Sequence, residues 1–95
     1  MIEYLYNAIK ATAAQDITLT AILTDVDGNP VEEDVSIMLH SDTEMIGKYD
    51  GDYFSGGIWS FTIPASATSG LSGRYWYCIC EKNNNLCFKQ PIYLV

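Results

Sequence analysis

Three cysteines near the carboxyl end of the sequence are the residues best suited to chemistry. Cys78 and Cys80 are two positions apart, so both side chains would lie on the same face of a β-strand. If the strand turns back through an even-numbered loop, Cys87 lies directly across from Cys80. Three thiolates could bind zinc, but no fourth ligand is near in the sequence, and zinc pairs usually have roughly two to four residues between them. We therefore expect buried or interfacial free cysteines, with no zinc and no internal disulfide.

The single histidine, His40, lies close to Asp42 and could be a general base with its orienting carboxylate. A Ser or Cys nucleophile cannot be placed beside this pair from spacing alone, so the catalytic set is incomplete. We expect His40 to lie on the outward face of a strand without a catalytic role. The chain is accordingly not expected to be an enzyme, and no cofactor is expected.

Asp25 and Asp27 alternate as carboxylates do in calcium loops. A calcium loop of the EF-hand type starting at Asp25 would need Gly at its sixth position and Glu at its twelfth, where this chain has Pro30 and Ser36. The run Asp-Gly-Asn-Pro is a typical turn sequence, so it predicts a plain turn, with a weak calcium site as the alternative.

Aromatic residues and acids are mixed in the segment 49–57, which contains Tyr49, Tyr53 and Phe54. Such a loop could bind a sugar by stacking rings on it while carboxylates hold its hydroxyl groups. A flexible hairpin with partly packed aromatics explains the composition equally well. The three aromatic residues are therefore a second candidate for a binding surface.

Short strands must position all of these residues. Apolar and polar residues alternate with period two at 17–24, 35–40 and 59–63, and further strands are expected at 2–9, 45–49, 73–80 and 86–95. This pattern predicts an all-β fold, an immunoglobulin-like sandwich of about seven antiparallel strands forming one domain over residues 1–95. The positions expected in the shared core are Leu19, Ile37, Trp59, Phe61, Tyr77 and Phe88.

The final hairpin is apolar on both faces, although one face of a small antiparallel sheet is normally polar. The register that pairs residue 80 with residue 87 puts alternate residues on the core face: Tyr75, Tyr77, Ile79, Phe88 and Ile92. It leaves the others on the outer face: Trp76, Cys78, Cys80, Cys87, Lys89 and Tyr93. Exposed aromatic patches usually mark contacts, so this outer face is the first candidate for a partner surface. Tyr75 is expected to form a tyrosine corner, and Tyr77 stands where antibody domains have a cysteine.

Length and charge narrow the class of protein. The chain has 95 residues, of which 48% are apolar, and its net charge is −7, so we expect one core and no nucleic-acid partner. Nine of the acids lie between residues 25 and 52 and predict a negative surface region. No run reaches the roughly 20 apolar residues that span a bilayer, and residues 1–6 lack the pattern of a secretory signal. We therefore expect no membrane partner and a chain that stays in a cytoplasm.

Two stretches resemble known families. Residues 23–31 resemble the Asp-x-x-Gly-Asn-Pro-Val turn of bacterial immunoglobulin-like domains of the invasin and intimin type. The chain also resembles immunoglobulin-like modules of bacteriophage structural proteins in the order of four features. These are this turn, an aromatic strand ending Ile63-Pro64-Ala65, the strand from Gly73 to Tyr77, and the last hairpin.

That resemblance implies a non-enzymatic virion protein, assembled in the cytoplasm of a bacterial host. It would attach to capsid, tail or baseplate by contacts with other virion proteins or with copies of itself. The alternative is a carbohydrate-binding module that recognises a glycan of the bacterial surface.

Overall fold

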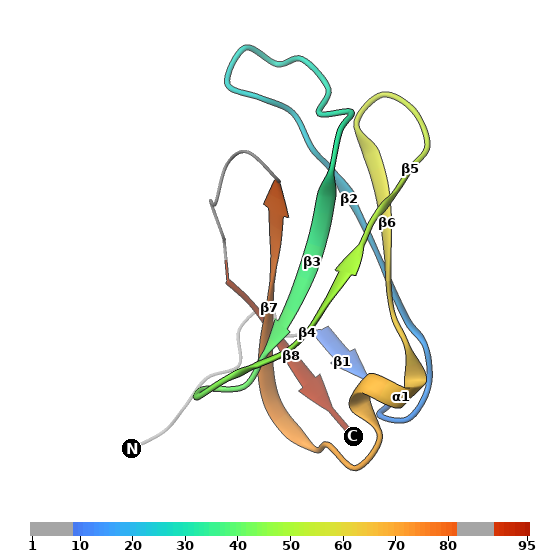
Figure 1. Ribbon diagram of the computed structural model, residues 1–95, viewed down its shortest axis with the longest axis vertical. Helices are drawn as coiled ribbons and strands as arrows, with labels where there is room; N and C mark the ends of the chain where they lie inside the picture. Colours follow the sequence, from blue (N-terminus) through green and yellow to red (C-terminus); the bar gives the residue numbers. More distant parts are fainter. Residues whose placement is uncertain (1–8, 82–88) are drawn as a thin grey trace.

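The computed structural model describes residues 9–81 and 89–95, which form two β-sheets (Figure 1). The elements in chain order are β1 (Ile9–Ala11), β2 (Ile17–Ile22), β3 (Val35–His40), β4 (Met45–Asp50), β5 (Asp52–Tyr53), β6 (Ile58–Ile63), the short helix α1 (Ala65–Thr68), β7 (Gly73–Glu81) and β8 (Gln90–Leu94). One sheet has the order β1-β8-β7-β3-β4 and the other β2-β6-β5. Within the described ranges, no helix is long and apolar enough to cross a membrane.

The all-β sandwich expected from the sequence is confirmed. In the immunoglobulin-like fold, strands B, E and D share one sheet and strands C, F and G the other. Here β2, β6 and β5 correspond to strands B, E and D, and β3, β7 and β8 correspond to strands C, F and G. Two details differ from the prediction. The described chain has eight strands, and β1 runs parallel to β8 instead of antiparallel. The predicted strand 2–9 lies, apart from Ile9, outside the described residues.

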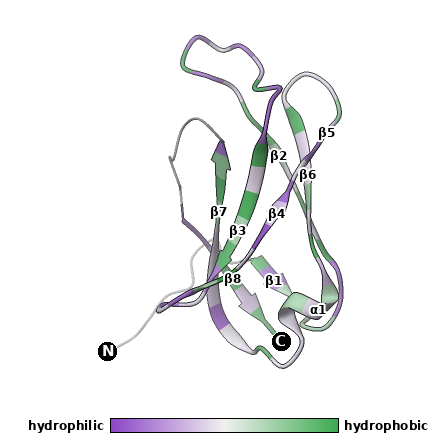
Figure 2. Ribbon diagram, viewed as in Figure 1, coloured by the Kyte–Doolittle hydropathy of each residue, from purple (hydrophilic) through white to green (hydrophobic). Residues whose placement is uncertain are grey.

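Alternating apolar side chains of the two sheets form the core. In the three-stranded sheet, Leu19 pairs with Phe61, and in the five-stranded sheet Ile37 pairs with Ile79. Of the six expected core residues, four are buried and Leu19 packs against the core half-buried, whereas Phe88 lies outside the described residues. The Trp59 indole N–H donates a hydrogen bond to the Val31 carbonyl at 2.8 Å. Figure 2 shows the mainly hydrophilic edge strand β4 beside the more hydrophobic β3.

Gly51 is the point at which the chain passes from one sheet to the other. It separates β4 from β5, and its N–H donates to the Val35 carbonyl at 2.8 Å. A Cβ at this position would lie 2.5 Å from the Phe61 ring and 2.9 Å from the Trp59 ring. Only glycine lets the backbone pass so close to two buried rings. Asp50 pairs with Ser36, so it lies on the outer side of the five-stranded sheet, directly before this crossing.

The β2–β3 connection contains a tight turn at residues 24–30, which we call the prong. Asp25 Oδ1 accepts hydrogen bonds from the N–H groups of Asp27 and Asn29, both at 2.9 Å. Gly28 has φ +84°, a conformation that glycine adopts without strain. The turn predicted from Asp-Gly-Asn-Pro is thus present, and one oxygen of the Asp25 carboxylate is used to close it.

Candidate functional site

The outer face of the five-stranded sheet gathers basic and aromatic side chains. Cross-strand pairing puts Tyr93 beside both Lys10 and Arg74, and Lys48 beside Met38. We call the following residues the basic face: Lys10, Lys48, Arg74, Trp76, Lys89 and Tyr93. Residues 9–81 and 89–95 contain four lysine or arginine residues in total, and all four belong to the basic face. The net charge of the chain is −7. The cations are therefore segregated on one side of the domain.

Trp76 lies at the centre of the basic face and is held from several sides. The His40 ring stacks on it with centroids 4.0 Å apart and 3° between the planes. Lys89 Nζ lies 4.4 Å from the centroid of the indole, at cation–π distance. The indole N–H donates to the Ser41 carbonyl at 3.1 Å. Trp76 is half-buried, so it acts as the fixed support of His40 and Lys89 rather than as a fully exposed anchor.

His40 points outward as expected, but its ring is partly shielded. Burial lowers the pKa of His40 below its ordinary value of 6.5, and the positive charge of Lys89 lowers it further. Its Nε2 atom is buried and has no hydrogen-bond partner among the described residues. No hydrogen bond or ion pair between His40 and Asp42 is present in this part of the chain. His40 is therefore neutral near pH 7 and serves as a stacking partner of Trp76.

Cys78 and Cys80 face the same side, as predicted, but they are not exposed. Their exposed fractions are 0% and 8%, because these small side chains lie in the middle of a wide sheet beside Met38 and Ser36. Their sulfur atoms are 3.8 Å apart. Cys78 belongs to a disulfide, so the expectation of a domain without one is wrong. Of the two cysteines among the described residues, Cys80 is a free thiol.

Burial also sets the acidity of the free thiol. It raises the pKa of Cys80, and the positive charge of Lys48 offsets part of this rise. Cys87 lies outside the described residues, and with it the predicted three-cysteine cluster. Within the described ranges, no group of three or more His, Cys, Asp or Glu side chains could hold a metal ion.

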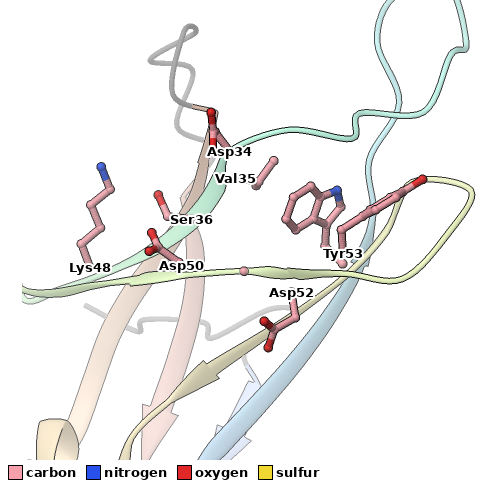
Figure 3. A pocket seen from close by; sticks show the side chains of 9 residues that line it. Asp34, Val35, Ser36, Lys48, Asp50, Asp52 and Tyr53 are labelled. Atoms are coloured by element: carbon pink, nitrogen blue, oxygen red, sulfur yellow. The ribbon is translucent and has the colours of Figure 1, made fainter.

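A groove of about 600 Å³ opens where the chain crosses between the sheets. The residues that line it are Asp34, Val35, Ser36, Lys48, Asp50, Gly51, Asp52, Tyr53 and Trp59. Figure 3 shows Lys48, Ser36 and Asp50 on one side of the crossing and Asp52 pointing away from them. The groove is thus polar on one side and aromatic on the other.

The three aromatic residues of segment 49–57 lie in different environments. Tyr49 is paired with Ile37 and packs against the core, so it faces inward. Tyr53 is half-buried, with its ring centroid 5.2 Å from that of Trp59, and its hydroxyl donates to Glu32 Oε1 at 3.4 Å. Phe54 is 67% exposed. The structure therefore brings only Tyr53 to the groove.

Sequence reasoning placed Trp76, Lys89 and Tyr93 on the outer face, but it missed the other half of the basic face, Lys10, Lys48 and Arg74, and most of the groove. Arg74 and Trp76 are two apart on one strand, and this spacing could have placed Arg74 outward. Lys10 and Lys48 belong to edge strands whose neighbours the sequence does not specify. The predicted tyrosine corner is wrong, because the Tyr75 hydroxyl makes no hydrogen bond with the described backbone.

No protein-family model and no curated protein matches the chain. Among solved structures, the fold is similar to part of a "putative glycoside hydrolase" from Bacteroides vulgatus ATCC 8482, with a TM-score of 0.56 and 15% sequence identity. The similarity covers 92% of this chain and 16% of that protein. At this identity the likeness concerns the fold, and the chain spans about a sixth of the length of its neighbour.

Proposed function

We propose that this chain is a non-enzymatic structural module of a bacteriophage virion, which attaches to an acidic protein surface of the capsid, tail or baseplate. The observation that carries the proposal is the segregation of charge. All four described cations lie on one sheet face of an acidic domain, around Trp76 and Tyr93. The family resemblance of the sequence supplies the virion context.

The chemistry of the basic face suits a protein contact. Aromatic and arginine side chains are enriched at protein interfaces, while charges around them steer the encounter and fix the orientation. Tyr93 is 38% exposed, so its ring is accessible to a partner. Lys89 is held over Trp76, so part of the side-chain order that binding requires is already present.

Incorporation into particles tests this proposal. The variants Tyr93→Ser and Lys89→Glu should each lower the amount of the chain in purified particles by about tenfold or more, because each removes a central contact. Ile22→Ser, on the other sheet, is the matched control. Normal incorporation of both basic-face variants, with a native circular dichroism spectrum, would contradict the proposal.

A carbohydrate-binding module is the second candidate, and the groove favours it. The half-buried Tyr53 offers aromatic surface in a groove whose lining includes Asp34 and Asp50, and an aromatic ring with a few polar groups is typical of ligand sites. A protein named for glycoside hydrolysis contains a domain of similar fold. Glycan-array binding that is lost in Asp50→Asn would favour this candidate, and an array without any bound glycan would count against it.

A further inference from the structure

The prong carries the most exposed large apolar side chain of the described residues. Val26 at its tip is fully exposed, at 102%. Figure 1 shows the prong extending past one end of the two sheets, while β1, β8 and the carboxyl terminus lie toward the other end. The molecule is 40 Å long in this direction. An exposed apolar side chain at the tip of a projecting turn is available to another molecule.

The prong is ordered by its own hydrogen bonds. Asp25 N–H donates to the Asn29 carbonyl at 2.8 Å, and Gly28 N–H donates to the Asp25 carbonyl at 3.0 Å. Thr24 and Pro30 form an isolated antiparallel bridge at its base. Such a segment loses little conformational freedom on binding, which favours association.

The charge of the prong is opposite to that of the basic face. Asp25, Asp27, Glu32 and Glu33 are exposed in the β2–β3 connection. No lysine or arginine occurs between Lys10 and Lys48 in the sequence, so nothing nearby in the chain neutralises these carboxylates. Every copy of the chain therefore carries an acidic, apolar-tipped projection and a basic, aromatic surface.

We propose that the prong of one copy docks on the basic face of a second copy. Val26 would pack against the Tyr93 ring, while the carboxylates of the prong approach Lys10 and Lys89. The prong and this part of the basic face lie toward opposite ends of the domain, so one chain cannot satisfy both within itself (Figure 1). The contact is head-to-tail, and such a contact builds a ring or a filament instead of a closed symmetric dimer.

This inference rests on the proposed function in one respect, namely that the basic face is a docking surface. A single prong covers a small area, so each contact is weak and depends on ionic strength. Repeated contacts in an assembly of many copies would strengthen it through high local concentration. We therefore expect self-association of the isolated chain at high protein concentration in low salt, and its loss in ~0.5 M NaCl.

Two complementary variants test the head-to-tail arrangement. Val26→Asp damages the prong and leaves the basic face intact, whereas Lys10→Glu combined with Lys89→Glu damages the basic face and leaves the prong intact. In sedimentation velocity, each variant alone should remain monomeric, with its dissociation constant raised at least about tenfold. An equimolar mixture should form a dimer that grows no further, because its two outer ends are both damaged.

Ile22→Asp is the matched control, since Ile22 is 71% exposed on the other sheet and the change is chemically the same as Val26→Asp. It should associate like the wild type. Circular dichroism checks that each variant is folded, and Asp27→Lys replaces Val26→Asp if the latter is not. A wild-type chain that stays monomeric in low salt, self-association of Val26→Asp, or a mixture that stays monomeric would each overturn the proposal.

Particle incorporation separates this inference from the proposed function. If the double lysine variant fails to enter particles while Val26→Asp enters normally, and the mixture stays monomeric, the docking function stands and self-association is wrong. If the mixture dimerises and the double lysine variant enters particles normally, self-association stands and the proposed attachment surface is wrong.

Discussion

Replacement of Gly51 by alanine should destabilise the domain at the crossing between its sheets. The added Cβ would lie 2.5 Å from Phe61 Cε1 and 2.9 Å from Trp59 Cε3, whereas ordinary contact is 3.4–4 Å. The Phe61 ring would have to retreat by about 1 Å, and it is completely buried. Overpacking of this kind costs about 1–3 kcal/mol. The smaller entropy of the unfolded alanine chain offsets about 0.4–1 kcal/mol of this.

We therefore expect the free energy of unfolding of Gly51→Ala to fall by about 1.3 kcal/mol. For a domain of this size, that loss lowers the Tm by about 5–10 °C. Urea unfolding followed by tryptophan fluorescence, with thermal unfolding followed by circular dichroism, measures both quantities. Gly70→Ala is the control, because a Cβ at Gly70 meets nothing within 4 Å and only its φ of +82° is unfavourable.

A double-mutant cycle identifies the cause of the loss. When Phe61 is first shortened to leucine, the Gly51→Ala change should cost at least about 1 kcal/mol less than in the wild type, because the clashing ring atoms are gone. A stability within about 0.5 kcal/mol of the wild type for Gly51→Ala, or strict additivity with Phe61→Leu, would refute the reasoning.

Three further predictions concern the core and the titrating groups. Trp59→Ala should lower the free energy of unfolding by about 3–5 kcal/mol, and an unchanged urea midpoint would contradict its place in the core. Because the folded pKa of His40 is lower than 6.5, the unfolded chain binds more protons below that pH, so stability should fall as pH decreases from 6.5 toward the folded pKa. His40→Gln should remove this part of the pH dependence, and an identical profile in both proteins would exclude His40 as its source. Cys80 should react slowly with thiol reagents in the native protein and rapidly in urea. Cys78 should react only after reduction, and its reaction in unreduced protein would contradict the disulfide.

The sequence predicts those parts of the fold that depend on local alternation. Period-two patterns located β2, β3 and β6 and the inward faces of Tyr77 and Ile92, because burial of one face selects the register. The parallel pairing of β1 with β8 has no local signal, since it joins segments far apart in the chain. The crossing at Gly51 is equally hidden, because the need for glycine arises from the Phe61 and Trp59 rings that fold against it.

For the candidate sites, the sequence predicted which side of the sheet a residue faces but not how exposed that residue is. The hairpin register correctly put Cys78, Cys80 and Trp76 on the outer side of the sheet. The exposed fraction of a residue, however, depends on how many strands lie beside it and on the size of its side chain relative to the neighbouring side chains. In the middle of a five-stranded sheet, small side chains are covered by their neighbours, whereas Tyr93, one strand from the edge, remains accessible.

The parallel pairing of β1 with β8 determines how the domain would respond to mechanical tension. Ile9 lies opposite Ile92, and Ala11 lies opposite Leu94. Val95 N–H donates to the Ala11 carbonyl at 3.0 Å, and Ala13 N–H donates to the Val95 carbonyl at 2.9 Å. A pull applied through the start of β1 and through Val95 therefore slides two parallel strands past each other. The hydrogen bonds between them are stretched together instead of opening one after another, so forced unfolding should be slow when tension runs along the chain through these two strands.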